Sequence, residues 1–219
     1  MHDVRQIAAA AGSLIAKTVH GIVTSIDPVN HAAKVAVQPE GVESGWLPVA
    51  ALAAGDIRIA RLPNIGEHVL LVPVEGDAEH MQINAFQYDT VVTPPVSPRT
   101  GKAAQAGELL IMAGCGAPPS SNQSGGGSQS AGAATQNAPW WHMTSQGLYS
   151  GAGQTTEALT NTGVSWKTGG VTMTLSASGL AVTGGKITSD QDVLAAGISL
   201  KSHIHTNGNN GNNTGAPVA

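Results

Sequence analysis

The sequence predicts an all-β protein with two unlike parts: a small N-terminal barrel and a C-terminal shaft that requires several chains. Three observations support this fold class. Short strand-like segments separated by turn residues fill residues 18–86. A Gly/Ser/Ala/Gln stretch over residues 116–139 then interrupts the pattern. From Val171 onward, apolar and Ser/Thr positions alternate with a period of two, which is typical of strands.

Composition sets the outer limits of this prediction. Of 219 residues, 41% are hydrophobic, enough for one ordinary domain, but only 3% are aromatic and 28 are glycine, which favours an additional extended or repetitive part. The net charge is −4 and Lys and Arg do not cluster, so we expect no nucleic-acid partner. Cys115 is the single cysteine, so an intrachain disulfide framework is excluded.

The N-terminus, residues 1–17, is expected to form a short amphipathic helix that docks on a neighbour. The apolar run between Arg5 and Lys17 is too short to span a membrane, and Asp3 does not suit a signal peptide. Helical spacing relates Val4, Ile7, Ala11, Leu14 and Ile15.

Residues 18–92 are expected to form a small Greek-key barrel. "TVHGIVTSID" alternates as a strand, "DPVN" places Pro28 in a turn, and "AKVAVQ" returns as the hairpin partner. Further strands are predicted at "GWLPVAAL", "DIRIARLP", "HVLLVPV" and "HMQINAF". Five or six strands in about 70 residues suit a barrel of this kind.

A connector is expected over residues 93–139, because its low-complexity part cannot bury enough apolar area to order itself and should act as a mobile loop or linker. Structure resumes with Trp140, Trp141 and Tyr149 at the start of a shaft, residues 140–197. The two tryptophans have two interpretations, a platform that stacks on saccharides or packing at the top of the shaft, and packing is favoured.

The strand text after Val171 should not fold as a single chain. Its apolar side chains are too few to offset the entropy of ordering, and a lone narrow sheet leaves both edges open. These side chains are Val171, Met173, Leu175, Leu180, Val182, Ile187, Val193, Ile198 and Leu200. Identical chains around one axis would pair their edges and bury this stripe, so the sequence predicts an obligate cyclic homo-oligomer.

Two histidines, His203 and His205, follow the last strand-like residues. In an extended strand they would lie on one side, roughly 6.5 to 7 Å apart. Two imidazoles cannot complete a tetrahedral zinc site, whereas three chains would supply six, which suits an octahedral metal such as iron or nickel with a structural role. The alternative is a pair of exposed histidines. Their position at the end of an oligomerising segment favours the metal.

Enzymatic chemistry is not expected. The sequence contains no nucleophile elbow, phosphate-binding loop or H-E-x-x-H motif, so neither catalysis nor a small-molecule substrate is predicted. Asp190 and Asp192 form a tight carboxylate pair. Around a threefold axis they would attract calcium, but as turn caps they fit the surrounding residues better.

Two stretches resemble the baseplate assembly protein V, or central tail spike, family of contractile-tailed bacteriophages. They are "GEHVLLVPVEGD" in the barrel and "DVLAAGISLKSHIH", which precedes a Gly-rich tail containing "TGAP". The resemblance covers roughly residues 15–90 and 165–217. It implies a homotrimer in which an OB-fold barrel attaches to a baseplate hub protein. An intertwined triple-stranded β-helix would follow and taper to a pointed metal-binding apex over residues 198–219.

The resemblance also implies a function. His203 and His205 of three chains would bind one iron ion, while the calcium and chloride ions of the family have no residues that match here. Sheath contraction would drive the spike through the host outer membrane. The protein would lie in the virion, at the tip of the tail baseplate, after assembly in the host cytoplasm. The alternatives are a saccharide- or receptor-binding barrel on a β-stalk, with Trp140 and Trp141 stacking on sugars, and the equivalent spike of a tailocin or secretion system.

Overall fold

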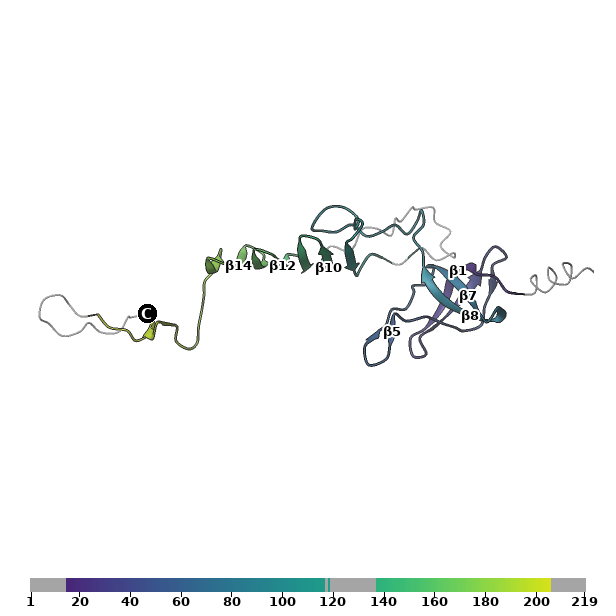
Figure 1. The fold of residues 1–219 in the computed structure, drawn as a ribbon, viewed down its shortest axis with the longest axis horizontal. Helices are drawn as coiled ribbons and strands as arrows, with labels where there is room; N and C mark the ends of the chain where they lie inside the picture. The colour runs from purple at the N-terminus through teal and green to yellow at the C-terminus, as the bar shows by residue number, and fades with distance from the viewer. Residues whose placement is uncertain (1–14, 117, 119–136, 206–219) are drawn as a thin grey trace, which may run out of the picture.

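The described part of the chain is elongated, with a rounded N-terminal body followed by a narrow shaft and a separate terminal segment (Figure 1). The computed structural model describes residues 15–116, 118 and 137–205, and these residues form strands and turns without a helix. The helix predicted over residues 1–17 lies outside them except for its last three residues, which are not helical. The Gly/Asn tail from residue 206 also lies outside them.

The N-terminal body contains a six-stranded antiparallel sheet in the order β3-β2-β1-β7-β8, with β4 paired to β2. This half-barrel confirms the predicted all-β N-terminal domain and is consistent with an OB domain. The strands are β1 (Val19–Asp27), β2 (Ala32–Val37), β3 (Val42–Glu43), β4 (Leu47–Pro48), β7 (His68–Val74) and β8 (Asp77–Phe86).

Alternation along these strands builds the core of the half-barrel. Val23, Val35, Val69, Leu71 and Ile83 are at most 1% exposed and pack together. The turn predicted at "DPVN" is present, because Asp27 Oδ1 accepts hydrogen bonds from the backbone N–H groups of Val29 (3.0 Å) and Asn30 (3.2 Å).

Two predicted strands are much shorter than expected. "GWLPVAAL" contributes only the two-residue strand β4, and "DIRIARLP" contributes only β6 (Arg58–Ile59), which pairs with β5 (Ala53–Ala54) as a small arm. Leu52 is 90% exposed and Ile57 is 73% exposed in this arm, so its apolar residues do not join the core that the alternation suggested.

The shaft is a seven-stranded antiparallel meander whose strands lie across the long axis (Figure 1). Each strand pairs with the strands before and after it in the same chain, so one chain forms this sheet by itself, and the interchain edge pairing expected from the sequence stays a prediction. From β10 onward, two-residue turns bring consecutive strands together and make this local pairing possible. The strands are β9 (Leu109–Met112), β10 (Pro139–Thr144), β11 (Gly147–Ala152), β12 (Thr155–Thr160), β13 (Gly163–Thr168), β14 (Val171–Ser176) and β15 (Gly179–Thr183).

A regular repeat underlies the meander. From β10 onward a strand begins every eight residues, and every second strand begins with glycine: Gly147, Gly163 and Gly179. A Cβ on Gly163 would lie 2.2 Å from the carbonyl oxygen of Leu175 on the adjacent strand, so a side chain cannot be accommodated there. Gly147 and Gly163 therefore allow the strands to approach closely at this side of the sheet, whereas Gly179 has open space beside it.

The residues between the half-barrel and β9 cover one face of the shaft at its base. His142 on β10 and Ser97 are both fully buried, and His142 Nδ1 lies 2.9 Å from Ser97 Oγ. His142 Nε2 lies 3.3 Å from Glu108 Oε2. Hydrogen bonding to the backbone N–H of Gln105, and then to His142, lowers the pKa of Glu108, so its carboxylate accepts the Nε2 proton and Ser97 donates to Nδ1. This arrangement attaches the connector to the shaft.

Candidate metal centre and subunit interface

The segment that carries the two histidines begins with a tight hairpin. Its strands are β16 (Leu194–Ala195) and β17 (Ile198–Ser199). The two turn residues, Ala196 and Gly197, have φ values of 51° and 85°, which suit a type I′ turn. Leu200 N–H donates to Val193 O at 2.8 Å and extends the pairing. The sequence "LAAGIS" thus folds locally into a hairpin.

Asp192 closes the base of this hairpin. Its Oδ1 accepts hydrogen bonds from the backbone N–H groups of Val193 (2.8 Å) and Lys201 (3.0 Å). A hydrogen bond from the Ser199 hydroxyl is the main cause that lowers the pKa of Asp192, followed by the Lys201 N–H. The side-chain carboxylate of Asp190, in contrast, has no hydrogen-bond partner among the residues that the structure describes. Asp192 therefore occupies the position of a turn cap, one of the two interpretations of the carboxylate pair, and calcium binding by the pair stays a prediction.

His203 is held in a defined tautomer by the same hairpin. Its Nδ1 lies 2.8 Å from the carbonyl oxygen of Ser199, and its backbone N–H donates to that oxygen at 3.1 Å. A carbonyl oxygen can only accept, so Nδ1 carries the proton and the lone pair of the neutral ring is on Nε2. This is the arrangement in which metal-binding histidines are usually oriented.

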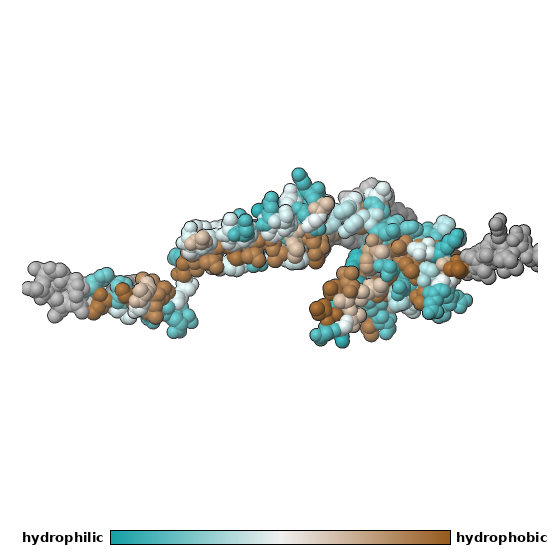
Figure 2. All heavy atoms as spheres, in the orientation of Figure 1, coloured by the Kyte–Doolittle hydropathy of each residue, from teal (hydrophilic) through white to brown (hydrophobic). Residues whose placement is uncertain are grey.

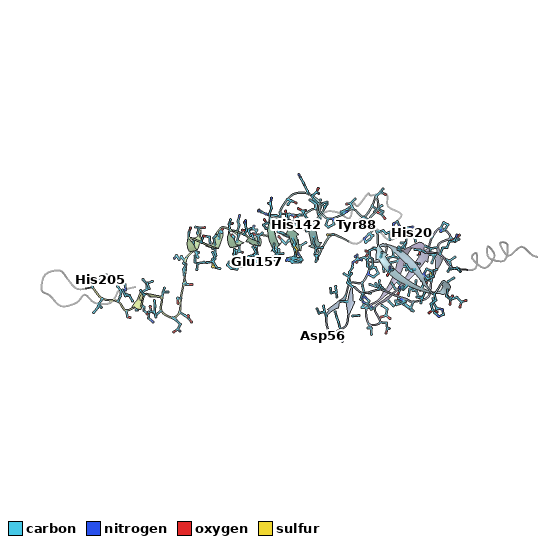
Figure 3. The ribbon with its side chains drawn as sticks, in the orientation of Figure 1. His20, Asp56, Tyr88, His142, Glu157 and His205 are labelled. Atoms are coloured by element: carbon cyan, nitrogen blue, oxygen red, sulfur yellow. The ribbon has the colours of Figure 1, made fainter. Side chains whose placement is uncertain are left out.

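His205 lies at the far end of the described chain (Figure 3), and its ring stands beside that of His203. The ring centroids are 5.0 Å apart and the ring planes are nearly perpendicular, at 81°. Residues 203–205 are not in a strand. The two imidazole rings therefore meet edge-on and do not project side by side from an extended strand as their spacing predicted.

The donor set of this pair fits a transition metal but does not complete a site. Neutral imidazole nitrogens are good ligands for iron, nickel and zinc. Within the part of one chain that the structure describes, no group of three or more His, Cys, Asp or Glu residues could hold a metal ion. Two imidazoles per chain leave a coordination shell open, so a closed site needs ligands from elsewhere.

The two tryptophans predicted as a possible saccharide platform lie on opposite faces of β10. Trp140 is 8% exposed and stands opposite Gly151, whereas Trp141 stands opposite Ser150 on the other face. Adjacent strand residues point to opposite sides, so these rings cannot stack on one ligand surface from a single chain.

One face of the shaft is apolar and exposed along its whole length, and Figure 2 shows it as a brown band along one side. Residues directly opposite one another in the register share a face and define rows that run across the strands. The row at one side, called the ridge here, contains only large aliphatic side chains and methionine. The ridge consists of Leu109, Met143, Leu148, Leu159, Val164, Leu175 and Leu180.

The row at the opposite side of this face is made of smaller residues: Pro139, Ala152, Thr155, Thr168 and Val171. Between the two rows, Glu157 is the single charged residue of the apolar face among the described strands. Its carboxylate accepts hydrogen bonds from Trp166 Nε1 (3.1 Å) and the Ser150 hydroxyl (3.2 Å). Figure 3 marks its place on the shaft.

The opposite face differs sharply beyond β11, where it carries Thr, Ser, Ala, Gly and Lys. On the apolar face, Leu159 is 47% exposed, Leu175 48% and Leu180 64%. Monomeric proteins rarely expose a contiguous apolar surface of this extent, so this face is a candidate interface. The apolar alternation was predicted only from Val171; the eight-residue strand period would have extended it back to β10, whereas β9 lies outside that period.

Comparison with known families identifies the N-terminal domain. Residues 19–88 match the model of the type VI secretion system/phage-baseplate injector OB domain. No curated protein matches the chain. No helix in the described ranges is long and apolar enough to cross a membrane.

The match sets the broad role of the protein. A phage-baseplate injector domain supports a role in a baseplate or spike, association with other baseplate components and a location in the tail. The half-barrel of β1 to β8 spans the matched residues. The match over residues 19–88 therefore supports a place for this chain in the baseplate spike family, through an N-terminal domain similar to the type VI secretion system/phage-baseplate injector OB domain.

Proposed function

We propose that this protein is the central spike of a contractile tail: a homotrimer that pierces the host outer membrane and whose tip is fixed by a metal ion. The observation that carries the proposal is the continuous apolar face of a shaft that extends from an injector OB domain. A monomer would leave this face in water. Three parallel chains would enclose it and keep all three OB domains at one end for attachment to a hub protein.

The metal would be held by His203 and His205 of each chain. Three chains supply six imidazoles, the number that fills an octahedral shell, and iron is the ion that the family resemblance favours. The Ser199 carbonyl supports this role because it directs Nε2 of His203 away from the hairpin. A filled shell has no position for a substrate, so the ion would crosslink three chain ends into one rigid point.

The proposed apex also fits mechanical penetration. A pointed end concentrates force on a small area of membrane, and a metal crosslink prevents three chain ends from separating under that force. The hairpin of β16 and β17 would place the histidines at a fixed height, because Asp192 closes its base and Ser199 binds His203. The equivalent spike of a secretion system would work in the same way.

Native mass and metal content test the proposal together. The purified protein should have three times the chain mass and about one equivalent of a transition metal per trimer, determined by light scattering and plasma mass spectrometry. The variant His203→Ala with His205→Ala should remain trimeric and lose the metal. A matched control, His20→Ala with His80→Ala, removes two exposed histidines of the N-terminal domain and should retain it.

Two results would contradict the proposal. A monomeric protein would exclude the trimeric spike. A trimer without a transition metal, or unchanged metal content in the His203/His205 variant, would exclude the metal-fixed tip.

A further inference from the structure

The apolar face of the shaft has an uneven profile. Its ridge side carries Leu159 on β12 and Leu175 on β14, both about half exposed. On the same two strands, four residues away, stand the smaller Thr155 and Val171. Each of these strands therefore presents a large side chain at one end and a smaller one at the other.

The side with smaller residues is hollowed. A depression of about 610 Å³ is lined by Thr155, Thr168, Val171, Trp166 and Met173, among others. The indole of Trp166 forms one wall and is fixed by its hydrogen bond to Glu157. Because the lining is mostly apolar, a complementary occupant should present aliphatic side chains.

The ridge of a second copy has the required chemistry and spacing. It presents one aliphatic side chain per strand, and the depression extends across several strands with the same spacing. We propose that the ridge of each chain inserts into the depression of the next chain, so that Leu159 meets the surroundings of Thr155 and Leu175 meets those of Val171. This pairing rests on the proposed trimer and specifies how its chains pack.

The pairing follows from the direction of the symmetry axis. An axis parallel to the shaft brings the ridge of one chain against the depression of another at the same height. A twofold axis across the shaft would instead place ridge against ridge, with the chains antiparallel and the OB domains at opposite ends. When each chain contacts the next through two unlike surfaces, the chains form a closed ring if the rotation between neighbours returns to the first chain. For three chains this rotation is one third of a full turn.

Disulfide crosslinking tests the pairing in a Cys115→Ser background. The double variant Leu159→Cys with Thr155→Cys should, on oxidation by copper phenanthroline, shift from monomer to a covalent ladder that ends at trimer on a denaturing gel. Each single variant should remain monomeric, because like residues of different chains are not adjacent. A disulfide requires Cβ atoms about 3.8 Å apart, so the result reports direct contact.

A second pair, Leu175→Cys with Val171→Cys on β14, guards against failure of the first variant to fold. Native light scattering before oxidation separates the two questions: a native mass other than trimer contradicts the proposed spike. Within an intact trimer, self-crosslinking of Leu159→Cys or Leu175→Cys alone, or no crosslinking of either double variant, overturns the pairing of ridge and depression.

Discussion

Truncation of one ridge residue provides a quantitative test of the interface. Complete burial of a leucine side chain contributes about 2 kcal/mol. Leu159 is 47% exposed in the single chain, so covering the remainder would contribute about 1 kcal/mol per chain, or about 3 kcal/mol per trimer, by the same area relation. Leu159→Ala should therefore lower the trimer association constant by about 100-fold, since every 1.4 kcal/mol is a factor of ten.

Sedimentation velocity over a dilution series measures this change directly. The matched control is Thr174→Ala, which shortens a side chain on the opposite face of the shaft and should leave association unchanged. Equal dissociation of both variants, or no effect of Leu159→Ala at any concentration, would falsify the assignment of this face to the interface.

Three further predictions concern the folding of individual segments. Asp192→Asn should speed hydrogen exchange at the Lys201 amide, whereas the control Asp190→Asn should not. In the unchanged protein the Asp192 carboxylate protects this amide; because the pKa of Asp192 is lowered below 3.8, the protection should be complete above pH 3.8 and disappear as the pH falls through the lowered pKa. Gly163→Ala should destabilise the shaft by about 1 to 3 kcal/mol through its clash with the next strand, whereas Gly170→Ala, with nothing within 4 Å, should not; thermal unfolding compares them, and equal midpoints would contradict the close approach. His142→Leu should lower the free energy of unfolding by about 1 to 3 kcal/mol, because it leaves the buried Ser97 hydroxyl without its acceptor. Limited proteolysis should then cut the connector faster, and unchanged cleavage would show that other contacts hold the connector.

The strands of the N-terminal domain were predicted well because apolar alternation and turn residues within short stretches of sequence define them. The alternation of β1 and the turn at Asp27 predicted the first hairpin, and the apolar run of β7 predicted a further strand. The longer strands predicted around Leu52 and Ile57 were wrong, because periodicity cannot show whether an alternating segment has a partner to pack against.

The shaft was predicted less completely because its pairing includes a distant strand. Leu109–Met112 pairs with β10 across more than twenty intervening residues, and nothing in four apolar residues identifies that partner. The glycines at intervals of sixteen would have predicted the meander from Gly147 onward.

The H-x-H motif predicted which residues form the candidate metal centre, but it did not predict how their rings are arranged. The H-x-H spacing identified His203 and His205, yet the edge-on arrangement of the rings depends on a backbone carbonyl four residues earlier. The burial of His142 against Ser97 likewise depends on a contact 45 residues away, which a single sequence does not reveal.

The strands of the shaft lie across its long axis, so the backbone hydrogen bonds that join them run along it (Figure 1). An axial push shortens these bonds and presses each strand against the next, and close-packed chains resist this strongly. An axial pull would load the bonds of one strand pair after another and allow the sheet to peel from its end. The shaft should thus be a stiff column in compression and a weak tether in tension, which is what the proposed spike would need if it is driven forward once and not drawn back.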